Sequence, residues 1–286
     1  MTIVGIICEY NPFHRGHRKQ FSEIRQRFGA DAAIVCLMSG NYVQRGAPAV
    51  FDREVRARAA ILSGADLVLE LPVTASLSSA EGFASAGVAI LSPLCDYLCF
   101  GTESGNSDAL MRTAQALLCP GFSEQLRQRL ATGGSFPAAR QQALEALGIP
   151  GTLLEQPNDI LATEYCKAIL EQEAPMTPVP LPRVGAGHGQ ALAESGHAQF
   201  ASASALRALW AEQGADALTP YVPEKALELY KKAEIDGMYT DHAAAGRCEL
   251  ALLRAACARP EPFAAVRGVS EGLDHRLENA VRSCTG

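Results

Sequence analysis

The 286-residue sequence lacks the features that mark membrane, secreted and repeat proteins. It has no apolar run long enough to cross a membrane, and Met1-Thr2-Ile3 leads into a strand pattern without the basic stretch of a secretory signal. It also has no internal repeat and no low-complexity tract. We therefore expect a globular cytoplasmic protein without membrane contacts, large enough to enclose a full hydrophobic core.

The sequence has no C-x-x-C pair, although it contains nine cysteines. They are scattered singly, at positions 8, 36, 95, 99, 119, 166, 248, 257 and 284. This spacing argues against a zinc ribbon and predicts reduced, buried thiols without metal-ligating residues. Cys95 and Cys99 flank a predicted strand, so we interpret them as core residues.

Acidic residues outnumber basic ones, giving a formal net charge of −6, but the two signs are unevenly distributed. Residues 1–60 hold nine Arg and Lys against five Asp and Glu, a net charge of +4, which leaves −10 for the rest. A basic N-terminal part is typical of a protein that binds phosphates or RNA, although ordinary solvated helix faces would account for it equally well.

Apolar runs of strand length alternate with amphipathic segments, which predicts an α/β protein with a parallel sheet and crossover helices. The expected strands are 3–8, 32–38, 66–71 and 97–100, with helices at 15–28, 53–63 and 80–91 between them. After residue 101 we expect helices at 107–118, 123–131, 137–147, 159–171 and 202–213, and a helical segment over 223–286. The proline-rich stretch 175–182 suits an edge strand or an extended connector.

The most informative segment is Glu9-Tyr10-Asn11-Pro12-Phe13-His14-Arg15-Gly16-His17, directly behind the first strand. Gly16 lets a phosphate approach the backbone, and the first turn of the next helix offers free N–H groups and the positive end of its dipole. His14 and His17 lie three residues apart, so both can donate to the same phosphate oxygens. The pair resembles the HxGH signature of the nucleotidyltransferase superfamily, whose histidines stabilise the α-phosphate during adenylyl transfer. In isolation, such a pair would equally suit a surface loop or a metal site.

Further polar segments follow the other predicted strands. The loop of residues 39–48 should face the His14–His17 turn, because loops at the carboxyl ends of parallel strands line one crevice. Gly101, at the end of the fourth strand, could let a base or ribose lie against the backbone, although a plain turn would also explain it.

Three motifs near helix starts could also contact a nucleotide. Asn158 suits either an N-cap or a contact to a base or ribose. Arg183 precedes a glycine-rich loop, where its guanidinium could bind phosphate in bidentate fashion. Ser204 and Arg207 resemble the [ST]-x-x-R helix start that many nucleotidyltransferases direct at the β- and γ-phosphates. Alternatively, Ser202 or Ser204 is simply the N-cap of the helix.

Taken together, these motifs resemble the bacterial tRNA(Met) cytidine acetate ligase family, in register over about the first 210 residues. The matching segments are GIICEYNPFHRGH (5–17), MSGNYVQRGAPA (38–49), GADLVLELP (64–72), SSAEGFASAGVAIL (78–91), FGTE (100–103), GGSFPAAR (133–140), QPNDILATEYCKAI (156–169), RVGAGHG (183–189) and FASASALR (200–207). The resemblance implies a Rossmann-like nucleotidyltransferase sheet of the HUP type with a helix-rich C-terminal part.

The resemblance also implies an activity. The protein would use ATP and Mg²⁺ to activate acetate as acetyl-adenylate and acetylate N4 of the wobble cytidine of elongator tRNA(Met). The catalytic residues would be His14, His17 and Arg207. The ATP site would comprise Ile7, Cys8, Glu9, Tyr10, Asn11, Pro12, Phe13, His14, Arg15, Gly16, His17, Arg18, Lys19, Gln20, Gly101, Asn158, Arg183 and Ser204.

Two departures from the family pattern affect these expectations. Position 15 is Arg where the family commonly has Asn, which adds a positive charge beside the phosphates. Family members also continue into a basic stretch that helps to hold tRNA, which suggests a shortened chain or a shorter relative. We therefore expect a catalytic domain over 1–215, with a helical insert at about 105–172, and the start of a tRNA-binding part over 216–286. Adenylate formation would survive the loss of that stretch better than acetyl transfer.

Two other functions fit the same sequence. One is a small-molecule adenylyltransferase, in which a phosphorylated metabolite attacks ATP. The other is a nucleotide- or RNA-binding module without catalytic activity. Oligomeric state cannot be read from the sequence.

Overall fold

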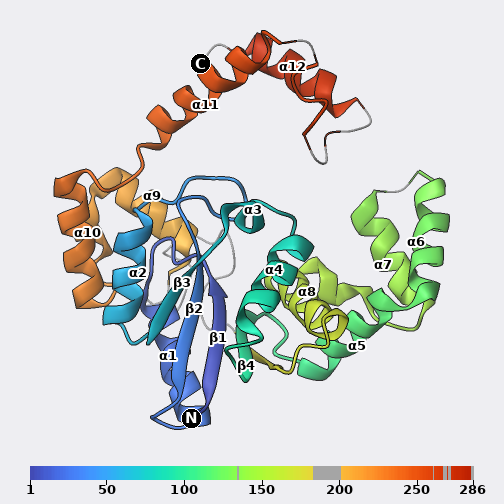
Figure 1. The fold of residues 1–286 in the computed structure, drawn as a ribbon, viewed down its shortest axis with the longest axis horizontal. Coiled ribbons are helices and arrows are strands. Elements are labelled where there is room, and N and C mark those ends of the chain that lie inside the picture. Colours follow the sequence, from blue (N-terminus) through green and yellow to red (C-terminus); the bar gives the residue numbers. More distant parts are fainter. Residues whose placement is uncertain (134, 183–200, 260, 267–268, 270–271, 285–286) are drawn as a thin grey trace. The chain divides into compact units, whose positions relative to one another are not determined.

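The computed structural model describes residues 1–133, 135–182, 201–259, 261–266, 269 and 272–284 (Figure 1). The chain forms two compact units, Met1–Met238 and Tyr239–Gly286. None of the helices in these described segments is long and apolar enough to cross a membrane.

The first unit is built on a five-stranded parallel sheet, which confirms the α/β prediction. The strands are β1 (Ile3–Cys8), β2 (Ala33–Ser39), β3 (Leu67–Leu71), β4 (Tyr97–Thr102) and β5 (Thr177–Pro182), in the order β3-β2-β1-β4-β5. The proline-rich stretch is indeed an edge strand. Prolines have no N–H group to donate, so they are tolerated in a strand that has a neighbour on one side only. The strand order reverses between β1 and β4, and such a switch point is where open α/β sheets bind ligands.

Helices cover both faces of this sheet, so its central strands β2, β1 and β4 are largely apolar on both sides. On one face, Val4, Ile6 and Cys8 of β1 belong to a core that also includes residues of α1 (Arg15–Phe28), α2 (Arg53–Leu62), α9 (Ala203–Gln213) and α10 (Glu224–Asp236). On the other face lies the core formed with α4 (Ala80–Leu91), α5 (Ser107–Leu118) and α8 (Pro157–Glu171). Gly87 of α4 lies so close to Ile7 that an added Cβ would be 2.3 Å from its Cδ1, so α4 packs tightly on β1.

The remaining helices of the first unit are α3 (Val73–Ser76), α6 (Pro120–Ala131) and α7 (Phe136–Ala146), with the 3₁₀ turns η1 (Gly151–Glu155) and η2 (Ala215–Leu218). Among these helices, α6 and α7 agree with the predicted pattern except at their ends. α6 and α8 begin earlier than expected because each starts at a proline, which is favourable at the first helical position. The short α3 was not predicted.

The boundary between the two units lies after Met238, whereas the sequence analysis placed the start of the C-terminal part at residue 216. The physical reason is that α10 packs against α2, with the rings of Tyr230 and Phe51 stacked at 4.5 Å. The second unit contains α11 (His242–Ala256) and α12 (Leu273–Ser283) around a small core of Cys257, Phe263 and Val281.

All nine cysteines are free thiols, as expected. Cys8, Cys36, Cys95, Cys99, Cys166 and Cys257 are buried, and this confirms the core assignment of Cys95 and Cys99. The prediction of buried thiols is wrong for Cys248 and Cys284, which are exposed, because they belong to the sparsely packed second unit.

Candidate nucleotide-binding site

The predicted His14–His17 turn lies at the switch point of the sheet. It connects the carboxyl end of β1 to α1, which begins at Arg15 as the sequence predicted. The neighbouring strand across the switch point is β4, whose last residues include Gly101. The fold therefore brings two of the predicted binding segments to adjacent positions at one edge of the sheet.

The two histidines cap the first turn of α1 reciprocally. Nδ1 of His14, the N-cap residue, accepts a hydrogen bond from the backbone N–H of Gly16 at 3.0 Å. Nδ1 of His17 accepts one from the backbone N–H of His14 at 3.2 Å. The two rings stack with their centroids 3.8 Å apart.

This capping defines the chemistry of both rings. A nitrogen that accepts a hydrogen bond carries no proton, so a neutral imidazole in this position carries its proton on Nε2. Both Nε2–H groups are therefore donors, on neighbouring rings at the N-terminus of a helix. A pair of donors beside the positive end of a helix dipole is suited to binding phosphate oxygens.

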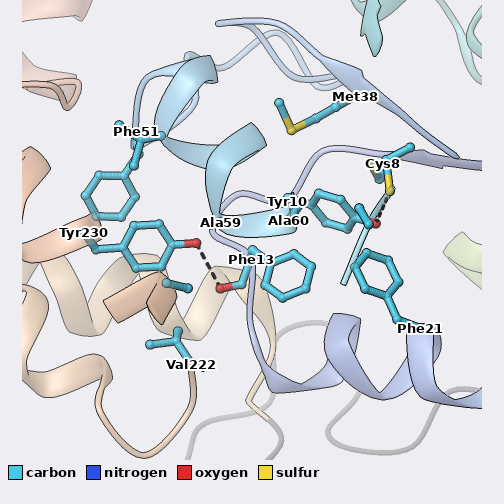
Figure 2. Close-up of a cluster of buried hydrophobic side chains, with 14 of the residues drawn as sticks. Cys8, Tyr10, Phe13, Phe21, Met38, Phe51, Ala59, Ala60, Val222 and Tyr230 are labelled. Carbon is cyan, nitrogen blue, oxygen red and sulfur yellow. Dashed lines mark hydrogen bonds between the residues drawn. The ribbon is translucent and has the colours of Figure 1, made fainter. Parts of the chain in front are cut away.

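The chain segments that hold this turn come from the end of the first unit (Figure 2). The buried Tyr230 hydroxyl donates to the carbonyl oxygen of Phe13 at 3.1 Å. The backbone N–H of Arg15 donates to the carbonyl of Tyr221 at 2.8 Å, and Nη1 of Arg207 donates to the carbonyl of Asn11 at 2.8 Å. Residues about 200 positions apart in sequence thus fix the turn, and α10 belongs to the same compact unit as the turn.

Arg207 also shapes the electrostatics of the turn. Burial lowers its pKa, the Glu9 carboxylate counteracts this shift, and the charge of Arg45 adds to it. Arg45 belongs to the loop after β2, which Glu9 anchors by accepting the N–H of Gln44 at 2.9 Å. The loop predicted to face the turn is thus connected to it through Glu9, and it carries a second guanidinium near Arg207.

Arg56 is a buried residue at this edge of the sheet that the sequence analysis missed. Its side chain is 0% exposed and donates to backbone carbonyls of Phe51, Glu9, Ser39 and Gly40. The only sequence signal was its place in the basic N-terminal part. A lone Arg in an amphipathic helix is normally exposed, so nothing in the local pattern indicated its burial.

Glu103 and Asp159 cross-connect the end of β4 and the start of α8. The Glu103 carboxylate accepts the N–H of Asp159 at 2.9 Å and contacts the amide of Asn158. In return, the buried Asp159 carboxylate accepts the N–H groups of Glu103 and Ser104, each at 3.0 Å. The interpretation of Asn158 as an N-cap is wrong, because Pro157 begins the helix two residues earlier than predicted and Gln156 takes the cap position.

The other predicted residues are distributed around this edge. Cys8, Tyr10, Asn11, Pro12 and Phe13 are buried, so their side chains support the turn. Arg18, Lys19 and Gln20 continue α1, with Lys19 paired to Glu23 at 3.5 Å and Gln20 donating to Cys99 at 3.6 Å.

Ser202 is the N-cap of α9 and its hydroxyl contacts that of the exposed Ser204. Arg183 and the glycine-rich loop after it lie outside the described residues.

A cavity of about 720 Å³ lies beside the junction of β4 and α8. Arg112, Thr152 and Gln156 are among its lining residues, but neither histidine is, so it is separate from the His14–His17 turn. Among the described residues, no group of three His, Cys, Asp or Glu side chains could hold a metal ion.

Comparison with known proteins shows which family this chain is similar to. The family model described as HIGH Nucleotidyl Transferase matches residues 1–286. The chain is 34% identical to the tRNA(Met) cytidine acetate ligase of Geobacillus sp. (strain WCH70), covering 98% of this chain and 70% of that protein. It is 35% identical to the protein of the same name from Halothermothrix orenii, covering 99% and 69%.

Two solved structures have the same fold. The crystal structure of apo Thermotoga maritima TmcAL (form I) gives a TM-score of 0.87 at 30% identity, covering 99% of this chain and 69% of that one. The same protein bound with alpha-thio ATP (form II) gives a TM-score of 0.85 at 30% identity, covering 99% and 68%.

Proposed function

The chain belongs to the HIGH nucleotidyl transferase family and, within it, to the tRNA(Met) cytidine acetate ligases, and on this premise we propose how it acts. It activates acetate with ATP as acetyl-adenylate and transfers the acetyl group to N4 of the wobble cytidine of elongator tRNA(Met). The observation that carries this proposal is the capped His14–His17 pair at the switch point of the sheet.

In the first step, an acetate oxygen attacks the α-phosphorus of ATP, and the bond from that phosphorus to the β-phosphate bridging oxygen breaks. Negative charge builds on the non-bridging oxygens and on the departing pyrophosphate. The Nε2–H groups of His14 and His17 stabilise the charge on the α-phosphate, and Arg207 stabilises the pyrophosphate. Because the donors are fixed by capping bonds before ATP arrives, little reorganisation accompanies the reaction.

In the second step, N4 of cytosine attacks the carbonyl carbon of the acetyl-adenylate and loses a proton, while AMP leaves with the electron pair of the broken C–O bond. The base has to be unstacked from its neighbours to reach the adenylate, as RNA enzymes commonly arrange. No covalent protein intermediate takes part, so no protein nucleophile is required. The identity of the partner RNA and the cytoplasmic location of the protein are also part of the proposal.

Mg²⁺ would act through the nucleotide. Mg²⁺ usually needs only one or two carboxylates beside the phosphate oxygens and keeps several waters. The described residues contain no three-ligand cluster, and the nearby carboxylates of Glu9 and Glu103 already accept hydrogen bonds. Mg²⁺ would be held by the nucleotide phosphates and would neutralise part of their charge, and we assign it no protein ligand.

The first test is exchange of labelled pyrophosphate into ATP. The proposal predicts exchange that depends on acetate and is not supported by pantetheine phosphate or nicotinamide mononucleotide. Exchange with one of those metabolites would instead indicate a small-molecule adenylyltransferase. ATP binding without any pyrophosphate release would indicate a binding module.

The second test is mass spectrometry of tRNA incubated with the protein, ATP and labelled acetate. The label should appear on one cytidine of elongator tRNA(Met), and its absence from an RNA with that cytidine replaced by uridine is the control. Acetate-dependent exchange without labelled RNA would separate the two steps and refute the transfer part of the proposal.

A further inference from the structure

The buried guanidinium of Arg56 is hydrogen-bonded to carbonyl groups and not to a carboxylate among the described residues. Nε donates to the carbonyl of Phe51 at 3.0 Å, and Nη1 donates to those of Glu9 at 2.6 Å and Ser39 at 3.2 Å. Nη2 donates to the carbonyl of Gly40. Burying a charge without an opposite charge in contact is costly, and burial accordingly lowers the Arg56 pKa. In return for this cost, the guanidinium provides a fixed cation with planar donor geometry at the carboxyl edge of the sheet.

The four carbonyls belong to three chain segments that meet at the carboxyl edge of the sheet. Glu9 directly follows β1 and opens the His14–His17 turn, while Ser39 ends β2 and Gly40 opens the loop after it. Phe51 lies just before α2, the helix that carries Arg56. Buried backbone carbonyls need hydrogen-bond donors, and at this edge the guanidinium supplies donors to carbonyls from all three segments.

The bond to Glu9 has a direct consequence for His17. The peptide that joins Glu9 to Tyr10 precedes a residue with φ of +45°, a left-handed conformation that is uncommon for a side chain other than Gly. Such a conformation persists only where the surroundings determine it. Arg56 holds the carbonyl of that peptide, and the Tyr10 ring lies 4.8 Å from the ring of His17. The chain of contacts therefore runs from Arg56 through the Glu9–Tyr10 peptide to one of the phosphate-binding rings.

The same carbonyl lies on the residue whose side chain anchors the loop after β2. The Glu9 carboxylate accepts the N–H of Gln44, and Arg56 holds the first residue of that loop through Gly40. We propose that Arg56 is a positioning residue for adenylation: it fixes the His14–His17 turn relative to the loop of residues 40–48, so that both bind the nucleotide in a preformed geometry. The inference rests on the proposed function for its activity readout.

The experiment compares Arg56→Lys and Arg56→Gln with the wild type and with Arg58→Lys, a matched control at an exposed position on the same helix. Each variant is assessed by circular dichroism and thermal unfolding, by kcat and KM for ATP in acetate-dependent exchange, and by ¹⁵N resonances of the histidine rings. The ammonium of Lys keeps the charge but cannot span carbonyls from three segments. A displacement of about 1 Å in a reacting group can cost 10²-fold in rate.

We expect folded Arg56→Lys protein with kcat at least tenfold lower, KM for ATP changed less than threefold, and shifted Nδ1 resonances of His14 and His17. We expect Arg58→Lys to match the wild type. A folded Arg56→Lys with wild-type kcat and unchanged histidine resonances overturns the proposal. So does loss of the fold in both Arg56 variants, because that result makes Arg56 purely structural.

Failure of the proposed function would be recognised separately. If the wild type binds ATP but shows no exchange with acetate, the activity assignment is wrong. In that case, the change in the ¹⁵N resonances of the histidine rings when ATP is added serves as the readout. Equal resonance changes in the wild type and in Arg56→Lys would refute the positioning role without reference to any acceptor.

Discussion

His14 and His17 each cap the backbone that carries the other: their rings stack 3.8 Å apart, and the Nδ1 of each accepts a backbone hydrogen bond within the same turn. In the proposed mechanism, the two residues are structural caps and phosphate donors at once. A substitution at either position removes both properties unless the replacement separates them.

Replacing His14 or His17 by Ala should lower acetate-dependent pyrophosphate exchange by at least about tenfold, because loss of one donor to a developing oxyanion typically costs about 10²- to 10³-fold in kcat. The chain should stay folded, because a lost N-cap costs only about 1 kcal/mol. The control for His14 is His14→Asn, which restores a good cap without a ring Nε2–H. Near-normal exchange in both Ala variants would refute the site, and recovery in His14→Asn would reduce His14 to a cap.

Tyr230→Phe should destabilise the first unit by about 1–2 kcal/mol, because it leaves the buried Phe13 carbonyl without this donor while keeping the ring that stacks on Phe51. Since Phe13 directly precedes His14, we also expect slower exchange. Urea unfolding and exchange kinetics provide the two measurements. Tyr221→Phe is the control, because Tyr221 holds the turn through its backbone carbonyl. Equal stability of the two variants would contradict the prediction.

Asp159→Ala should cost about 2–3 kcal/mol of unfolding free energy, because the buried carboxylate accepts hydrogen bonds from two backbone N–H groups and the Ser104 hydroxyl. Asp108→Ala, at an exposed position in the first turn of α5, should cost less than about 1 kcal/mol. Urea denaturation of both variants tests this. Similar losses at the two sites would show that the Glu103–Asp159 connection contributes little.

Stability should fall as the pH rises above 9. Burial raises the pKa of the Cys99 and Cys166 thiols from 9.0 to about 12 each. Between these values the unfolded chain loses the proton and the folded chain keeps it, so the stabilisation is complete below pH 9 and is lost as the pH rises towards 12. Each thiol contributes a slope of at most about 1.4 kcal/mol per pH unit.

Urea unfolding at pH 7, 9 and 10 should therefore show a smaller decline in Cys99→Val than in the wild type. The exposed Cys248 provides the control, since Cys248→Val should decline as the wild type does. Parallel declines in all three proteins would show that Cys99 does not ionise on unfolding in this range.

Local sequence was sufficient to predict the elements that depend on local chemistry. The start of α1 at Arg15 follows from the strand, turn and cap residues before it, and the edge position of β5 follows from its prolines. Asn158 was misplaced by the same kind of reasoning, because a polar residue suited to capping was preferred over Pro157 as the first helical residue.

Long-range contacts could not be predicted in this way. Nothing near Tyr230 in sequence indicates that its hydroxyl donates to Phe13, 217 residues away. The expected boundary at residue 216 likewise missed the packing of α10 on α2, which keeps that helix with the first unit.

The sequence by itself determined the parallel α/β pattern and the placement of two histidines at a helix start, because periodicity, turn residues and capping act over a few positions. Only the tertiary structure decided how those histidines are oriented and what holds them. Their Nδ1 atoms are engaged by the backbone, and Arg56, Arg207 and Tyr230 fix the turn from distant parts of the chain. The physical reason is that a buried donor can be satisfied by a carbonyl from any segment, and only the assembled fold selects which one.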